Sequence, residues 1–375
     1  MENLLSFSSV MGVIGSVLLA ILILLAMITV HEFGHYVAGK IFHFKINEFA
    51  IGFGPALFKH KKKNGELVSV RCLPLGGYCA FEGEDSDNPH PDAFNNKKPW
   101  QRIIVLFAGA FMNYLLALLL IVISFSACGQ LLLMTFVEPA ADPAYNEYSL
   151  QDKDIIISCE GKDIYLTTDL MDALEGKKQG DLVKFTLSRE EEGKRTIQTV
   201  QVMLRADADF ADLTDTKTLW DALGIQKAYA EDGETYSYRI YTTAFKGFGF
   251  FETIGRSFVY SFRIGGTIFK VLGQLLTGNL GLDAFGGPVS TIKITSQIAS
   301  RGFQQFLEIS AFIGVNLAVF NLLPIPALDG SKIVFTVIEW IRGKPINRKV
   351  EAVIHAVGFV LLLGFAVLVD LLQLF

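Results

Sequence analysis

The chain opens with a long uncharged segment that ends in a cluster of ionisable side chains. Asn3 to Val30 is a run of 28 residues without a charged side chain, and His31-Glu32-Phe33-Gly34-His35 follows it directly. About 20 apolar residues are enough for a helix to cross a bilayer. We therefore expect a transmembrane helix from Val10 to Val30. Ionisable groups at membrane depth are costly and are candidates for a functional role.

The spacing of the two histidines in this cluster fits a shared metal ion. Four residues advance an α-helix by roughly 400°, so His31 and His35 lie one turn apart on the same face, where both can bind one Zn²⁺. Glu32 lies beside them and can act as a general base on a water molecule. The H-E-x-x-H pattern at the end of a membrane helix therefore indicates zinc-dependent hydrolysis.

Composition extends the membrane assignment to the whole chain. Of the 375 residues, 51% are hydrophobic and 31 are Phe, which is too apolar for an ordinary soluble enzyme. The net charge of −5 comes without a basic stripe, so we expect the lipid bilayer and no nucleic acid as a partner. Four segments are long and apolar enough to span the bilayer: Val10–Val30, Ile103–Ala127, Ile309–Leu328 and Ala352–Val369.

Lys and Arg are distributed unevenly among the connections between these spans. The segment from Tyr36 to Arg102 contains ten of them and the connection from Asp329 to Glu351 contains five, whereas both chain ends contain none. By the positive-inside rule, the H-E-x-x-H end of the first span faces the cytoplasm. Both termini and the long middle segment are then expected outside the cytoplasm.

The segment from Phe42 to Tyr78 has a strand pattern. Pro55–Lys62 and Glu66–Leu73 flank Asn64-Gly65, a dipeptide suited to a hairpin turn. Apolar sequence that includes Gly52 and Gly54 adjoins this hairpin. It is either an ordinary cytoplasmic hairpin or a membrane-associated one that offers an unpaired edge to an extended peptide, with both glycines contributing to substrate binding.

The middle of the chain is less apolar. Leu131 to Arg205 predicts a small α/β module, with a strand at Asp154–Ser158, a helix at Thr167–Leu174 and a hairpin around Glu192-Gly193. The acidic stretch Asp207–Glu234 predicts a loosely ordered linker. In Tyr241–Leu276 the charged residues recur on one helical stripe, which favours a helix in the outer membrane interface over a fifth span.

A catalytic zinc usually takes three protein ligands, so the two histidines need a third partner. Asp329 is the best candidate because it follows an apolar span that Pro324 and Pro326 interrupt. The alternative is that Asp329 caps the helix beginning near Ser331. His355 is a weaker candidate for the metal.

Asn113 and Asn321 are amides in otherwise apolar segments. Each could bond a neighbouring helix. Each could also hold a substrate backbone in extended form, which cleavage of a helical peptide requires because a helix shields its own peptide groups.

At these residues the chain resembles the site-2 protease family of intramembrane zinc metalloproteases, and it is closest to the bacterial branch that cleaves anti-sigma factors and leftover signal peptides. The matching motifs cover nearly the whole length: His31 to His35, Gly52-Phe53-Gly54-Pro55, Pro74-Leu75-Gly76-Gly77-Tyr78 and Asn321 to Gly330. The resemblance implies that His31, His35 and Asp329 bind zinc, Glu32 is the catalytic base and Asn321 helps to position substrate. It further implies that Leu131 to about Arg205 is a PDZ module.

Two positions depart from the family pattern. Ala110 stands where a proline is usual before Asn113, which should alter the start of the second span. A glycine usual before Asp154 is missing, which puts carboxylate-terminus binding by the PDZ-like module in doubt. That module would instead exclude substrates with bulky outer domains.

Together these features predict a polytopic α-helical membrane protein with about four transmembrane helices, a membrane-associated β-hairpin and an inserted α/β PDZ-like domain. The expected divisions are a zinc-binding membrane part at 1–127, the PDZ-like domain at 128–206, an acidic linker with interfacial helices at 207–300, and a second membrane part at 301–375.

The expected activity is cleavage of transmembrane segments of single-pass membrane proteins, such as anti-sigma factors or remnant signal peptides, in the plasma membrane of a bacterium, with one Zn²⁺ per chain. One rival is a zinc carrier or sensor, which has no use for the general base Glu32. The other is a PDZ scaffold with a vestigial metal site, which the complete H-E-x-x-H motif does not favour.

Overall fold

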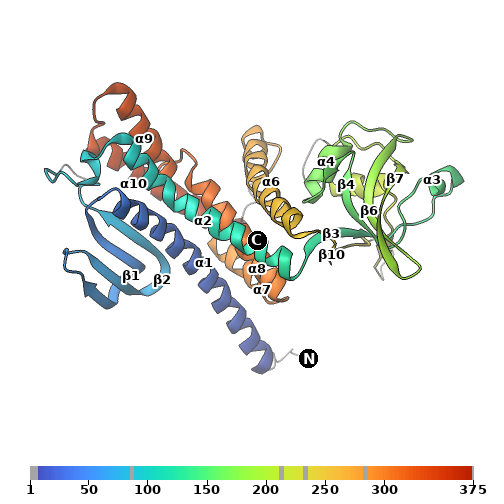
Figure 1. Ribbon diagram of the computed structural model, residues 1–375, viewed down its shortest axis with the longest axis horizontal. Coiled ribbons are helices and arrows are strands. Elements are labelled where there is room, and N and C mark those ends of the chain that lie inside the picture. Colours follow the sequence, from blue (N-terminus) through green and yellow to red (C-terminus); the bar gives the residue numbers. More distant parts are fainter. Residues whose placement is uncertain (1–6, 85–87, 211–214, 231–234, 282–285, 374–375) are drawn as a thin grey trace. The chain divides into compact units, whose positions relative to one another are not determined.

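The computed structural model describes residues 7–84, 88–210, 215–230, 235–281 and 286–373. It divides into two compact units, which are described separately. One contains Met1–Ile123 and Ile264–Phe375, and the other contains Ser124–Arg263. Figure 1 shows both units in sequence colours.

Among the described residues, four helices are long and apolar enough to cross a membrane: α1 (Phe7–Ile41), α2 (Pro99–Ala127), α8 (Phe303–Asn321) and α10 (Arg348–Leu372). Their number agrees with the prediction of about four transmembrane helices. The end of the third span was predicted wrongly, because α8 stops at Asn321 and not at Leu328. Pro324 and Pro326 lack the backbone N–H that a continuing helix needs.

Small residues allow α1, α2 and α8 to pack closely. A β-carbon at Gly34 of α1 would lie 2.3 Å from the carbonyl oxygen of Ala108 on α2. A β-carbon at Gly314 of α8 would lie 3.0 Å from the Ala117 side chain on α2. Close backbone approach through glycine is a common way for membrane helices to associate. It brings the H-E-x-x-H face of α1 directly against α2, and the two helices run side by side in Figure 1.

The other described helices that lie wholly in this unit are shorter: α7 (Pro288–Ala299), α9 (Asp329–Arg342) and the 3₁₀ turn η1 (Phe94–Asn96). Helix α6 (Phe250–Thr277) is long, begins in the other unit and ends in this one. The predicted helix at Tyr241–Leu276 starts later than expected, since Ile240–Phe245 is strand β10. Among the described helices α6 does not qualify as a membrane span, and its placement in the membrane interface stays a prediction.

The predicted hairpin is present but longer than expected, with strands β1 (Ile46–Lys61) and β2 (Leu67–Phe81). Both strands bend in the middle. As a result residues 48–51 pair with 67–70 on one side and with 77–80 on the other, while 56–61 pair with 67–71. Gly52 and Gly54 adopt φ of +88° and +81° at the bend of β1, a conformation that favours glycine. The segment 77–80 therefore forms one edge of this small sheet, and no described strand covers it.

The unit Ser124–Arg263 is built on a six-stranded sheet. Its main path runs β10 (Ile240–Phe245), β3 (Gln130–Thr135), β4 (Asp154–Cys159), β6 (Leu182–Glu191) and β7 (Lys194–Met203), and β5 (Lys162–Asp163) pairs with β4. Helix α4 (Thr167–Leu174) packs on this sheet, and α3 (Pro143–Glu147) precedes β4. The predicted strand, helix and hairpin of this module are all present.

The prediction of a loose linker at Asp207–Glu234 was wrong for its described part; residues 211–214 and 231–234 lie outside the described residues. Helix α5 (Thr216–Ala222) and strand β8 (Lys227–Tyr229), which pairs with β9 (Tyr236–Tyr238), belong to this stretch and its flank. Leu219, Trp220 and Ile225 are buried in the same core as Phe185 of β6. Burial of these apolar side chains therefore stabilises an ordered structure in a stretch whose acidic composition favours disorder.

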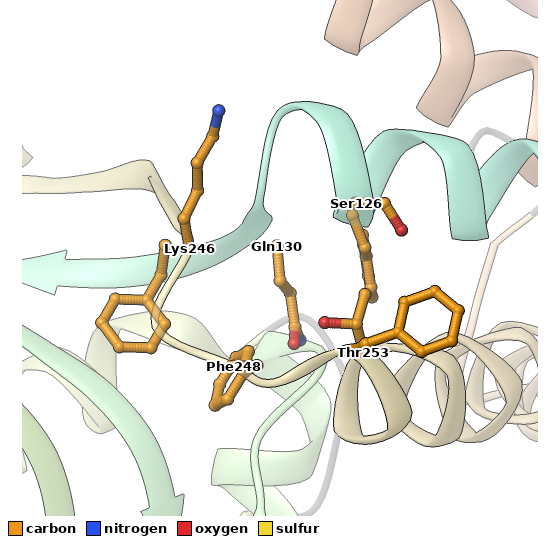
Figure 2. Close-up of a pocket in the computed structure, with 8 residues that line it drawn as sticks. Ser126, Gln130, Lys246, Phe248 and Thr253 are labelled. Atoms are coloured by element: carbon orange, nitrogen blue, oxygen red, sulfur yellow. The ribbon is translucent and has the colours of Figure 1, made fainter.

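A small cavity of about 160 Å³ lies where α2 ends and α6 begins, within the same unit. Gln130 lines it together with Phe248 and Thr253 (Figure 2). The buried Arg256 donates from Nε to the Gln130 amide oxygen over 2.6 Å and forms an ion pair with Asp163. The contact with Arg256 fixes the orientation of the Gln130 amide, because a guanidinium has only donors.

Candidate metal centre and active site

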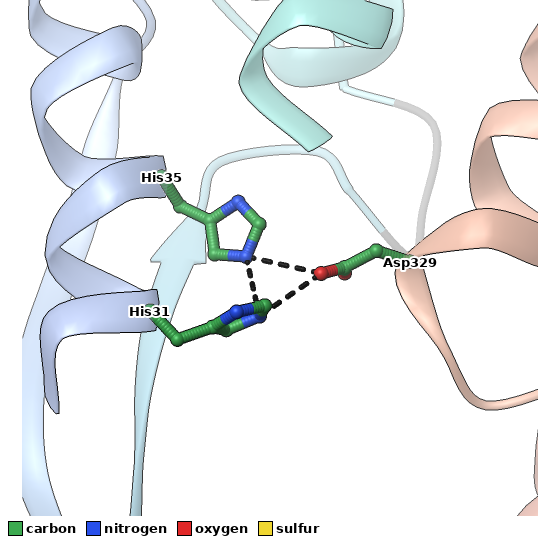
Figure 3. Close-up of side chains that lie close together, drawn as sticks. All are labelled: His31, His35 and Asp329. Carbon is green, nitrogen blue, oxygen red and sulfur yellow. Dashed lines mark hydrogen bonds and ion pairs between the residues drawn. The ribbon is translucent and has the colours of Figure 1, made fainter. Parts of the chain in front are cut away.

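Three side chains from distant parts of the sequence meet at one point. His31 Nε2 lies 3.0 Å from Asp329 Oδ2, His35 Nε2 lies 3.2 Å from the same oxygen, and the two Nε2 atoms are 3.1 Å apart (Figure 3). Donor atoms bound at about 2.0–2.1 Å to a tetrahedral zinc ion are roughly 3.3 Å from one another. The three atoms could therefore hold Zn²⁺ after a slight outward shift, and a tetrahedral ion held by them would have one position free for water or substrate.

Helix geometry and one glycine place the two histidines. Helix α1 continues through the motif to Ile41, so both imidazoles project from one face. Gly109 of α2 lies directly against them, since a β-carbon there would be 2.3 Å from His35 Nε2 and 2.8 Å from His31 Cε1. Only a residue without a side chain leaves room for both rings.

Each histidine also has a contact on the ring nitrogen that faces away from the metal position. His35 Nδ1 lies 2.8 Å from the carbonyl oxygen of Val105 on α2. His31 Nδ1 lies 3.3 Å from the side-chain amide of Asn321 at the end of α8. Zinc binding through Nε2 requires a proton on Nδ1, so the amide must present its oxygen to His31 in the loaded enzyme. Such outer contacts fix the tautomer and orientation of metal-binding histidines.

Glu32 is oriented by the bent hairpin. The backbone N–H of Cys79 in β2 donates to Glu32 Oε2 over 3.0 Å. Glu32 lines two cavities that both reach Asp329. One, of about 280 Å³, also contains Asn113 and Asn321. The other, of about 300 Å³, runs along residues Tyr78 to Phe81 at the sheet edge. Glu32 is therefore accessible from both cavities, as a candidate general base must be to reach a reactant.

The thiol of Cys79 is not a competing nucleophile. Burial and the nearby carboxylate of Glu32 raise the pKa of this thiol well above its usual range. A protonated thiol is a poor nucleophile. Glu32 and the three candidate metal ligands therefore remain the candidates for catalysis at this site.

The other predicted residues divide into two groups. Asn113 is fully buried and lines the first cavity, and neither of its amide atoms has a hydrogen-bond partner among the described residues. Gly52 and Gly54 line neither of these cavities, and their observed role is to bend β1. Substrate binding by these two glycines stays a prediction.

Sequence reasoning missed three contributors to the site. They are the Val105 carbonyl, the Cys79 N–H and the open space at Gly109. Two are backbone groups, which every residue carries, so no side-chain pattern could single them out. The glycine in the second span was the only available signal.

Comparison with known proteins agrees with this geometry. The model of peptidase family M50 matches residues 19–365. The chain belongs to peptidase family M50. It is 35% identical over 360 residues to a protein of Clostridium perfringens provisionally named a zinc metalloprotease, covering 95% of this chain and 97% of the relative.

Two more relatives carry the same provisional name. One from Fusobacterium nucleatum is 30% identical over 94% of this chain and 96% of its own length. One from Brucella suis is 27% identical over 96% of this chain and 95% of its own length. As a member of family M50, the chain is a multi-pass membrane zinc metalloprotease of the site-2 type, with His31, His35 and Asp329 as its candidate zinc site.

Proposed function

We propose that this M50 metalloprotease cleaves peptide bonds within or beside the transmembrane segments of single-pass membrane proteins. The observation that carries this proposal is the position of Glu32 in both cavities, between the buried amide of Asn113 and the open edge of residues 77–80. An extended peptide laid along that edge would pass the general base and the metal position together. Strand addition to an open edge is a common mode of peptide binding.

The residues divide the reaction between them. Zinc, when bound, supplies the Lewis acidity that makes water nucleophilic at neutral pH and polarises a carbonyl group. Glu32, held by the Cys79 N–H, takes the proton from the attacking water and passes it to the leaving amine. The Val105 carbonyl and Asn321 keep the two imidazoles in place meanwhile.

Asn113 is suited to hold the substrate backbone. The buried amide of Asn113 has no hydrogen-bond partner among the described residues. Leaving such a donor and acceptor unsatisfied costs free energy, which a bound group that hydrogen-bonds to the amide would recover. A peptide group offers one donor and one acceptor, and a helix must open before these become free. Asn113 therefore compensates part of the cost of unwinding the substrate.

The unit Ser124–Arg263 acts, on this proposal, as a PDZ-like size filter. Asp154 is fully buried and accepts two hydrogen bonds from Arg189, so its carboxylate serves the fold. Strand β3 pairs with β10 on one side and with β4 on the other. These features favour exclusion of bulky outer domains over capture of a free carboxylate terminus.

The proposed setting follows from the charge distribution. The connections rich in Lys and Arg support a topology in which the active site faces the cytoplasm, with both termini and the PDZ-like unit outside, in the plasma membrane of a bacterium. The expected substrates are anti-sigma factors or remnant signal peptides. The bilayer brings enzyme and substrate together.

Cleavage of a tagged single-pass substrate by the purified enzyme in liposomes tests the proposal. The wild type should cleave it, a chelator should stop cleavage and added zinc should restore it. Glu32→Gln should keep zinc and lose turnover. A Glu32→Gln variant that cleaves at the wild-type rate would remove the base assignment. Zinc flux across the liposome with no cleavage by the wild type would favour a carrier, and metal-independent substrate binding alone would favour a scaffold.

A further inference from the structure

The backbone that holds Asp329 differs from the regular helix that holds the two histidines. It is the first residue of α9 and follows a non-helical connection that contains Pro324 and Pro326. Ala327, two residues before Asp329, adopts φ of +80°. This left-handed conformation is unfavourable for a residue with a β-carbon, and it persists only where surrounding contacts hold it.

The contacts that hold this connection come from α10. The backbone N–H of Ala327 donates to His355 Nδ1 over 3.0 Å. Gly358 lies against the same segment, since a β-carbon there would be 2.3 Å from Pro326 Cβ and 2.8 Å from its carbonyl oxygen. Helix α10 therefore fixes the chain immediately before Asp329.

His355 itself is not part of the metal cluster, which among the described residues consists of His31, His35 and Asp329. Its Nδ1 accepts from a backbone donor, and Phe335 of α9 packs against its ring with centroids 5.6 Å apart. His31 is held by Asn321 of α8 and His35 by Val105 of α2. We therefore expect a contact that holds Asp329 in the way that Asn321 and Val105 hold the two histidines.

We propose that His355 is a positioning residue that fixes Asp329 for zinc binding through the backbone of Ala327. The proposal rests on Asp329 being the third zinc ligand. Metal sites tolerate ligand displacements of about 0.2 Å, and loss of an outer support typically weakens metal affinity 10- to 100-fold. The required group is an acceptor at the position of Nδ1, so the amide oxygen of Asn can replace it and Leu cannot.

The experiment compares His355→Leu with His355→Asn in purified enzyme, with Val357→Leu on the same helix as a matched control. Zinc affinity is measured by competition with a chelator, and thermal unfolding is followed with and without zinc. His355→Leu should bind zinc 10- to 100-fold more weakly and lose more Tm in the presence of zinc than in its absence. His355→Asn and the control should bind zinc within about threefold of wild type.

Several outcomes would overturn the proposal. Wild-type zinc affinity in His355→Leu would do so, and so would an equal loss of Tm with and without zinc, which indicates a purely structural role. If His355→Leu does not fold, His355→Gln can replace it in the comparison, because the longer side chain displaces the acceptor by one bond. His355→Gln should then bind zinc more weakly than His355→Asn. Equal zinc affinities of these two variants would contradict the proposal. A separate Asp329→Ala variant with unchanged zinc affinity would refute the ligand assignment itself.

Discussion

Gly109 gives the sharpest test of how the metal centre is built. In the Gly109→Ala variant the new β-carbon would lie 2.3 Å from His35 Nε2 and 2.6 Å from His35 Cε1. Ordinary contacts of this kind begin near 3.4 Å, so the His35 ring or helix α2 must move by about 1 Å. Such a shift is several times the roughly 0.2 Å that a metal ligand tolerates.

We therefore expect Gly109→Ala to weaken zinc binding by at least 10- to 100-fold, which corresponds to about 1.4–2.7 kcal/mol. Zinc affinity in chelator-buffered solution measures this directly. Gly364→Ala is the matched control, because among the described residues no atom beyond its own stretch of helix lies within 4 Å of a β-carbon at that position. Wild-type zinc affinity in Gly109→Ala would show that α1 and α2 do not approach as closely as described.

Two further predictions concern substrate and pH. Asn113→Leu should lower kcat/KM for a membrane substrate by about 10- to 100-fold and leave zinc affinity unchanged. This loss corresponds to ~1–3 kcal/mol, as expected for a lost buried hydrogen-bonding partner. A simultaneous loss of zinc affinity would contradict a role in substrate binding. Burial alone would raise the pKa of the Glu66 carboxyl, but hydrogen bonds from Lys40, Lys62 and Asn64 prevail and lower it from 4.5 to about 2. The stabilisation from Glu66, at most about 3 kcal/mol, is therefore complete above pH 4.5 and is lost as the pH falls toward 2. Thermal unfolding between pH 6 and pH 3 should show a smaller loss of Tm for Glu66→Gln than for the wild type, and equal losses would refute this assignment.

The three candidate metal ligands could be predicted from the sequence because ionisable side chains are rare in membrane segments. His31 and His35 share a helical face by spacing alone, and Asp329 stands out as a carboxylate after an apolar span. The distances between them depend on tertiary packing. Gly34 and Gly314 let three helices approach, and neither the approach nor its partners can be read from local periodicity.

The prediction of a loosely ordered linker was wrong for a physical reason. The acidic side chains of Asp207–Glu234 dominate its composition, whereas a few large residues determine its packing. Trp220 and its neighbour Leu219 lie on a helix of only seven residues, too short for a clear periodic signal. The end of α8 was misjudged for the opposite reason, because an apolar run continued past the point where Pro324 stops the helix.

The hydrogen bond between Cys79 and Glu32 has a consequence for how cleavage positions are chosen. In an edge strand, every second peptide group points outward, so within the segment 77–80 the peptide group of Gly77 faces the same way as that of Cys79. A substrate that binds there, as proposed above, would align its own peptide groups with Gly77, beside the Cys79 N–H that already donates to Glu32. The position of the scissile bond would then depend on the register of the substrate backbone along the strand. Such a mechanism can act on apolar substrates of varied sequence, because it does not require particular side chains.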